Sequence, residues 1–149
     1  MRNIEGMQEN EILDVEYMSR DDFEKINQNP PANSICISIS TRYDRFRPVE
    51  LSPKWDNTLR LTFDAHVPTN DEHGFTDELA DSVVKFALDN IKPTTEKLIV
   101  HCGEGRVRSP AIAIVIGYMY YAPANDCKSM DKEVFWQMKR AFKRKMRNV

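Results

Sequence analysis

The residues best able to do chemistry in this chain are Cys102 and Arg108, which are separated by five residues. A cysteine thiolate is a strong nucleophile, and a neighbouring guanidinium group favours this ionised form. The planar guanidinium of Arg108 can also hold two oxygens of a phosphate group at once. Gly103 and Gly105 lie between the two residues and allow the backbone to approach a ligand closely. The spacing therefore predicts a loop that wraps a tetrahedral oxyanion and presents a nucleophile to it.

The segments on either side of this loop predict how it is positioned. The largely apolar stretch 97–100 predicts a short buried strand, and the apolar run 111–121 predicts a helix. The start of a helix offers free N–H groups and the positive end of its dipole to an anion. Ser109 can donate a hydrogen bond to the cysteine sulfur, and the ring of His101 can support the loop. The candidate phosphate-binding residues are Gly103, Glu104, Gly105, Arg106, Val107, Arg108 and Ser109.

Strands and helices alternate along the rest of the chain. Period-two patterns predict strands over 12–17, 34–40 and 58–63. Ser19 and Thr76 each precede acidic residues, which is typical of capped helix starts. A last amphipathic helix, over residues 131–147, has Val134, Phe135, Met138, Phe142 and Met146 on its inward face. The alternation predicts one α/β domain over residues 1–149, with a central, mostly parallel sheet of about four to five strands flanked by helices. The phosphate loop would then join a central strand to a helix.

The pattern His101-Cys102-x-x-Gly105-x-x-Arg108-Ser109 resembles the signature of the cysteine-dependent protein tyrosine and dual-specificity phosphatases. The apolar strand before it, the Ser-Pro-Ala-Ile-Ala segment after it and the long helix upstream are also similar to that superfamily. Two further segments, 37–40 and 59–64, resemble those of small bacterial and phage-type tyrosine phosphatases. The resemblance implies a phosphatase-like domain with the phosphate loop at its active site.

The resemblance also implies a two-step hydrolysis of a phosphomonoester, with a phosphorylated protein or peptide as the substrate. The Cys102 thiolate attacks phosphorus to form a cysteinyl-phosphate, which water then hydrolyses. Arg108 and the loop amides stabilise the transition-state oxygens, and Ser109 helps the sulfur to leave. A general acid protonates the leaving oxygen and then acts as a base toward water. No metal and no cofactor is expected in this reaction.

The general acid is the residue at which this sequence departs from the family pattern. The family carries an Asp just after the strand that precedes the long helix, and this chain has Ala65 there. Asp64, one residue earlier, is the first candidate, and Asp71 in the following loop is the second. His66 and Glu72 are also present in this stretch. A third possibility is that the chain lacks an effective acid, which would cost about 10²–10⁴ in rate for a poor leaving group.

Three functions are compatible with these residues. The first is a phosphatase acting on phosphotyrosine, or on both phosphotyrosine and phosphoserine or phosphothreonine. The second is a catalytically impaired module that binds phosphate groups, which the alanine at position 65 motivates. The third is a phosphatase of phosphoinositides or RNA 5′-phosphates that uses the same loop, which Arg106 and the basic C-terminal segment motivate.

Composition and charge limit the remaining interpretations. The chain of 149 residues is 41% hydrophobic, which is enough for a packed core, and its net charge of -2 predicts no general affinity for nucleic acid or membranes. Segment 128–149 nevertheless carries eight Lys or Arg residues against two acidic ones, a net charge of +6. The last helix therefore has either a solvated basic face or a surface that docks an acidic partner, a membrane surface or nucleic acid.

The three cysteines, Cys36, Cys102 and Cys127, follow no regular spacing, which argues against a disulfide framework or a zinc site. The first residues lack the apolar core of a signal peptide, and the run 111–121 is too short to span a membrane. These features predict a cytoplasmic location, where thiols stay reduced.

Overall fold

The computed structural model of the chain describes residues 12–41, 48–64, 67–68, 71–103, 107–122, 124 and 130–147. Within these ranges strands and helices follow one another in the order that the sequence predicts. The elements are β1 (Asp14–Ser19), α1 (Arg20–Asn27), β2 (Ser34–Ser40), β3 (Asn57–Thr62), α2 (Asp77–Asn90), β4 (Lys97–Cys102), α3 (Arg108–Met119) and α4 (Lys132–Arg147). The first strand lies two residues later than expected, and α3 ends at Met119 rather than Tyr121.

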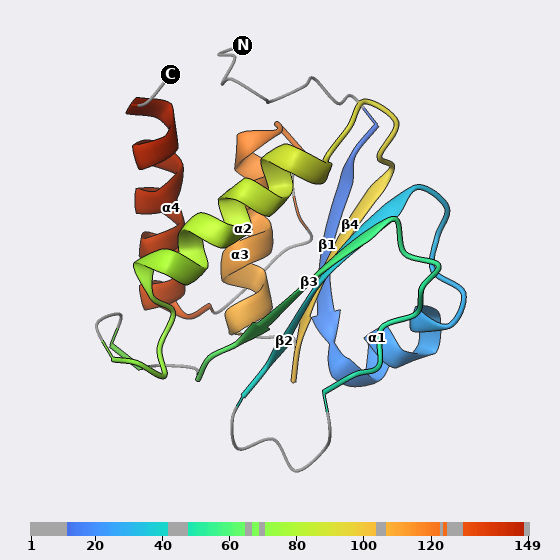
Figure 1. The fold of residues 1–149 in the computed structure, drawn as a ribbon, viewed down its shortest axis with the longest axis horizontal. Helices are drawn as coiled ribbons and strands as arrows, with labels where there is room; N and C mark the ends of the chain where they lie inside the picture. The colour runs from blue at the N-terminus through green and yellow to red at the C-terminus, as the bar shows by residue number, and fades with distance from the viewer. Residues whose placement is uncertain are drawn as a thin grey trace.

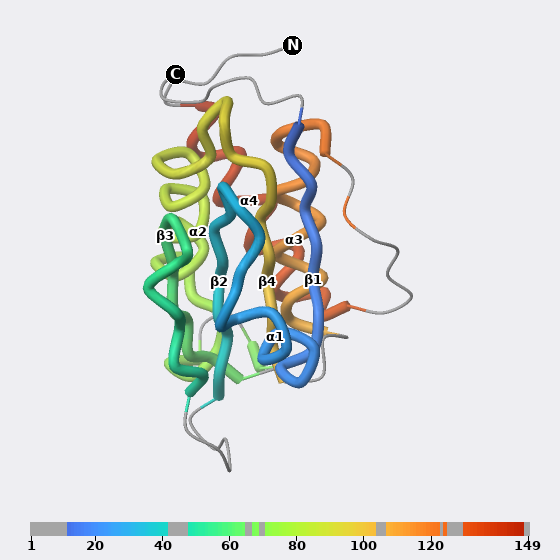
Figure 2. The backbone as a smooth tube through the Cα atoms, turned by 90° about the vertical axis from the view of Figure 1, so that its right-hand side faces the viewer, coloured from blue at the N-terminus to red at the C-terminus, as the bar shows by residue number. Residues whose placement is uncertain are grey.

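The four strands form one sheet in the order β1-β4-β2-β3, and every neighbouring pair is parallel. Figure 2 shows the strands side by side in this order. β4 lies between β1 and β2, so the strand that carries Cys102 is central. Parallel strands bring their carboxyl ends to the same edge of a sheet, where ligands of open α/β folds usually bind. The predicted fold class is confirmed, and the loop after Cys102 begins at this edge.

Helices cover the two faces of the sheet unequally. α2, α3 and α4 lie on one face, and α1 lies on the other (Figure 1). Successive side chains of a strand point to opposite faces. Ile35, Ile37 and Ile39 of β2 therefore join the larger core with α2, α3 and α4, whereas Cys36 belongs to a smaller core with Phe23 of α1. Side chains at adjacent positions of one strand thus enter different environments.

Side-chain caps fix where three of the helices begin. Ser19 Oγ accepts a hydrogen bond from Asp22 N at 3.2 Å, and Thr76 Oγ1 accepts one from Leu79 N at 3.2 Å, as the sequence predicts for both. Asp131 Oδ1 accepts from two backbone N–H groups in the first turn of α4, at 3.0 and 3.3 Å. A cap of this kind contributes about 1 kcal/mol to stability.

The apolar face of α4 is less completely covered than its sequence pattern predicts. Val134 and Met138 are buried in the larger core. Phe135, Phe142 and Met146, which the pattern also places inward, are only half-buried. The period of the helix predicts which side chains share a face, but the extent to which neighbours cover that face depends on tertiary packing.

One basic residue of α4 is paired with the neighbouring helix rather than simply solvated. Arg144 Nη2 lies 2.8 Å from Asp81 Oδ1 of α2, and its Nη1 lies 3.6 Å from Asp77 Oδ1. The two carboxylates are more than half exposed, so each pair contributes no more than about 1 kcal/mol. The pairs orient the C-terminal half of α4 against α2.

α3 is an apolar helix of 12 residues, and no helix in the described part of the chain is long and apolar enough to cross a membrane. It ends in a Schellman motif. Ala122 N donates to Gly117 O at 2.8 Å, and Tyr121 N donates to Tyr118 O at 3.5 Å. Tyr121 has a φ of 56°, in the left-handed region that glycine usually occupies at this position.

Replacing Tyr121 by glycine is expected to stabilise the protein by about 1 kcal/mol, because glycine adopts the left-handed conformation without steric cost. The tyrosine side chain is 70% exposed, so its removal loses little packing. The same substitution at Tyr118, which is 74% exposed but inside α3, is expected to destabilise by a similar amount. Urea unfolding followed by circular dichroism measures both changes. If Tyr121→Gly and Tyr118→Gly both raise or both lower the unfolding free energy, the assignment of the Schellman motif is contradicted.

Candidate active site

Cys102 is the last residue of β4, and its side chain faces α3. Strand alternation places it in the same core as Leu98 and Val100, and it is only 2% exposed. Its Sγ atom lies 3.2 Å from Ser109 Oγ in the first turn of α3. Because a thiolate can only accept a hydrogen bond, an ionised Cys102 would take one from the Ser109 hydroxyl. The structure therefore brings together two residues that the sequence expects to act together.

Arg108, the first residue of α3, is buried and folds back over the start of the loop. Its Nη1 donates to the carbonyl oxygen of Phe63 at 2.8 Å, and its guanidinium carbon lies 5.8 Å from the centre of the Phe63 ring. A β carbon at Gly103 would lie 3.7 Å from Nη2 of the same guanidinium. The cation is thus held between the first residue of the loop and the segment that leaves β3.

The start of α3 differs from the starts of the other three helices. Val107 occupies its N-cap position and has no polar side-chain atom with which to cap. Ser19, Thr76 and Asp131 accept hydrogen bonds at the corresponding ends of α1, α2 and α4. The first N–H groups of a helix without such a cap, together with its dipole, favour a bound anion. This end of α3 is therefore suited to a phosphate group.

Backbone hydrogen bonds hold both described ends of the loop. Arg20 N donates to Gly103 O at 3.0 Å, and Asp131 N donates to Val107 O at 2.8 Å. These bonds tie the loop to the starts of α1 and α4. The three predicted phosphate-binding residues in between, Glu104, Gly105 and Arg106, lie outside the described residues.

His101 supports the loop from the α1 side of the sheet. Its Nε2 lies 2.6 Å from Ser38 Oγ, its Nδ1 lies 3.4 Å from the Cys102 carbonyl oxygen, and its ring stacks on Phe23 with centres 4.1 Å apart. Because a carbonyl only accepts, Nδ1 carries the ring proton and Nε2 accepts from the Ser38 hydroxyl. Burial is the main cause that lowers the pKa of His101 to about 4, and the Arg20 guanidinium contributes in the same direction. The ring is therefore neutral at neutral pH.

The two candidate acids occupy different environments. Asp64 directly follows Phe63, whose carbonyl holds Arg108, so the Asp64 backbone lies beside the guanidinium group. Its side chain is half-buried, with Oδ1 buried, and its backbone N donates to His73 O at 2.7 Å. Asp71 is exposed, and its Oδ1 accepts from His73 N at 2.8 Å, as in an Asx turn. Of the two, Asp64 is the one linked to the residues around Cys102.

Two contacts at this site involve partners that the sequence analysis missed. The sequence does contain a signal for Ser38, because a serine within a buried strand requires a hydrogen-bond partner. The Phe63 carbonyl has none, because every residue carries a backbone carbonyl group. Ala65, at the family's usual place for the acid, and His66 lie outside the described residues.

A polar cavity of about 270 Å³ adjoins the loop on the α1 side. Gly103, His101 and Ser38 line one part of it, and α1 contributes Arg20 and Glu24. Arg20 Nε pairs with Glu24 Oε1 at 3.0 Å. The cavity places charged and polar side chains of α1 beside Gly103, on the face of the sheet opposite to Cys102.

Cys36 provides a contrast to Cys102 within the same sheet. It is completely buried in the smaller core, and burial raises the pKa of its thiol to about 12, with a smaller opposing effect of Arg60. A thiol in this environment is chemically inert. Cys127 lies outside the described residues, and among those described no group of three His, Cys, Asp or Glu side chains could hold a metal ion.

The depressed pKa of His101 predicts a specific pH dependence of stability. Between pH 6.5 and about 4 the unfolded chain binds a proton at this residue that the folded protein does not, so stability falls as the pH is lowered through this range. From pH 6.5 to 4.5 the loss is about 2–3 kcal/mol. The stability of the His101→Gln variant should lack this pH-dependent component. In urea unfolding, the difference in unfolding free energy between the wild type and the variant should therefore shrink as the pH falls. A constant deficit would contradict a neutral, buried imidazole.

Comparisons with family models, with curated proteins and with solved structures found no match to this chain. The chemistry of the site is therefore inferred from the sequence pattern and from the arrangement of Cys102, Arg108 and Ser109.

Proposed function

We propose that the protein is a cysteine-dependent phosphatase of the protein tyrosine and dual-specificity type, which hydrolyses phosphomonoesters on proteins or peptides. The observation that carries this proposal is the 3.2 Å contact between Cys102 Sγ and Ser109 Oγ, with the Arg108 guanidinium folded back to Gly103. A nucleophile, a hydroxyl donor and a cation are thus gathered at the start of an uncapped helix, where an anion is favoured. The residue pattern from His101 to Ser109 supports the same reaction.

In the proposed first step, the Cys102 thiolate attacks phosphorus, a sulfur–phosphorus bond forms and the bond to the leaving oxygen breaks. Asp64 gives its proton to that oxygen, and Arg108 stabilises the charge on the non-bridging oxygens. In the second step, water attacks phosphorus and loses a proton to the Asp64 carboxylate. The sulfur–phosphorus bond breaks, inorganic phosphate leaves, and the Ser109 hydroxyl stabilises the returning thiolate.

The proposed chemistry also bears on the compartment. A thiolate nucleophile is lost when it is oxidised or enters a disulfide, so the reaction requires reducing conditions. We therefore propose the cytoplasm as the site of action. The buried position of Cys102, which is 2% exposed, limits its access to large oxidants.

Hydrolysis of para-nitrophenyl phosphate between pH 5 and 8 provides the direct test. Cys102→Ser should abolish turnover, and Arg108→Lys should lower kcat by about 10²–10³, because lysine cannot reproduce the bidentate contact. Cys36→Ala is the matched control, since it removes an inert thiol from the same sheet, and it should retain activity. Vanadate binding without any turnover by the wild type would instead favour a phosphate-binding module.

The identity of the acid is tested by comparing leaving groups. Asp64→Asn should lower kcat for phenyl phosphate by about 10²–10⁴, and should have much less effect on 2,4-dinitrophenyl phosphate, whose leaving group needs no proton. Asp71→Asn should leave both rates unchanged, because the asparagine oxygen can still accept from His73 N. The reverse result would assign the role to Asp71. Equal losses on both substrates would indicate that Asp64 supports the site without donating a proton.

A further inference from the structure

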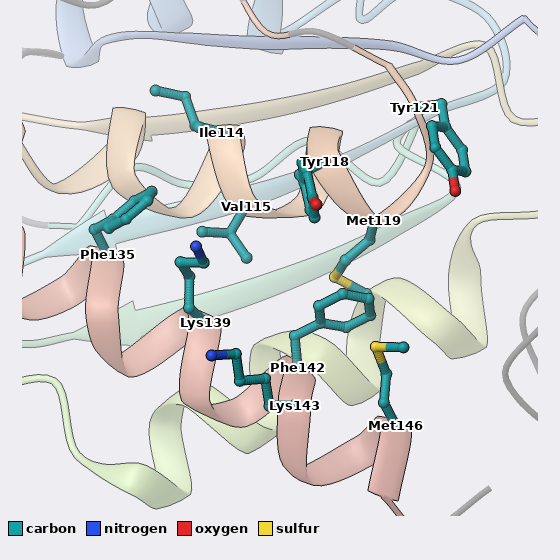
Figure 3. A pocket seen from close by; sticks show the side chains of 10 residues that line it. All are labelled: Ile114, Val115, Tyr118, Met119, Tyr121, Phe135, Lys139, Phe142, Lys143 and Met146. Carbon is teal, nitrogen blue, oxygen red and sulfur yellow. The ribbon is translucent and has the colours of Figure 1, made fainter. Parts of the chain in front are cut away.

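An open groove of about 590 Å³ lies between α3 and α4, outside the site described above. Met119 of α3 and Phe135, Phe142 and Met146 of α4 contribute apolar surface to it. Figure 3 shows the Phe142 ring between the side chains of Met119 and Met146. The three α4 residues are the same ones that the sequence places inward and that the fold leaves half-buried. A recessed apolar surface between two helices is the kind of groove that an amphipathic segment can enter.

The charged residues at the groove all have the same sign. Lys139 and Lys143 are the charged side chains among the residues that line it, and Figure 3 shows both on the α4 side. Within the described ranges neither lysine has an acidic partner, whereas Arg144 of the same helix is paired with Asp81. Lys139 Nζ lies 5.5 Å from the centre of the Phe135 ring, so this cation lies beside the apolar surface. The groove therefore combines apolar contacts with two positive charges that form no ion pair with the acidic residues described.

We propose that this groove binds an acidic, amphipathic peptide segment of another protein. Phe135 and Met146 are eleven residues apart, or about 16 Å along a helix, which matches about three helical turns of a bound peptide. Lys139 and Lys143 are one turn apart and complement two carboxylates with the same spacing. Apolar side chains on the adjacent peptide face would enter the groove, and its two methionines can adapt to their shape.

The recessed shape of the surface favours a peptide over a membrane. A bilayer contacts residues that project from a protein, whereas a helix or an extended segment can enter a groove between two helices. The interaction depends on neither Cys102 nor Arg108. Catalytically inactive Cys102→Ser protein therefore suffices for its test, and failure of the proposed hydrolysis would leave it unaffected.

The test is a selection from a phage-displayed library of random 12-residue peptides on the full chain. The selected peptides should be enriched in Asp and Glu at positions four apart, with large apolar residues on the adjacent helical face. The Lys139→Glu/Lys143→Glu variant should bind them about tenfold more weakly by fluorescence anisotropy, and added salt should weaken binding to the wild type. Lys132→Glu/Lys145→Glu is the matched control, with the same change in charge at two exposed positions outside the groove, and should change affinity by less than about twofold.

Several outcomes would overturn the proposal. Failure to enrich any peptide, or peptides that bind the Lys139→Glu/Lys143→Glu variant as tightly as the wild type, would exclude this groove as the binding site. A second outcome is that the selection yields no acidic peptides, that the wild type sediments with phosphatidylserine vesicles, and that the Lys139→Glu/Lys143→Glu variant, unlike the control variant, does not. This result would assign the groove to a membrane. A dimer in light scattering that the same variant disrupts would assign it to a second copy of the chain.

Discussion

The alternation of side chains at the carboxyl end of β4 is the constraint on which the candidate site depends. It sends Cys102 toward α3 and His101 toward α1, although the two residues are adjacent in the chain. Cys102 meets Ser109 at the start of a helix, whereas the neutral His101 ring is enclosed by Phe23 and hydrogen-bonded to Ser38. A register shift of one residue would exchange the two side chains and place an imidazole where the proposed reaction needs a thiolate.

The two described ends of the loop after β4 are hydrogen-bonded to helices that are distant from them in the sequence. The first residue of α1 and the capping residue of α4 each donate a backbone hydrogen bond to one end of it. Arg108 adds a third connection through the Phe63 carbonyl. Fixed dipoles and cations stabilise a phosphoryl group most when they need not reorganise during the reaction. Bonds from three different elements hold Gly103, Val107 and Arg108 in place in this way.

α4 combines two roles along its length. Its start is bonded to the loop through Asp131, and its later turns are oriented on α2 by Arg144. Between these two contacts the helix leaves Phe142 and Lys139 half-buried and Lys143 exposed. Val134, Met138 and Ala141 of the same helix are already buried in the larger core, so rolling the helix to bury Phe142 further would expose them. This arrangement explains why an amphipathic pattern that predicts a fully covered face produces an open groove.

The sequence by itself determined the order of strands and helices along the chain, the caps at Ser19 and Thr76, and the spacing that places Cys102 at the end of β4 and Arg108 at the start of α3. Each of these depends on residues that are close in the chain, so local pattern and spacing reveal them. Only the tertiary structure decided that Ser38 supports His101, because the two residues are 63 positions apart and meet through the register of β2 and β4. The tertiary structure also decided that Asp64 rather than Asp71 lies next to the residue that binds Arg108, and that the groove between α3 and α4 stays open. Strand order and helix packing determine both features, and neither leaves a local pattern in the sequence.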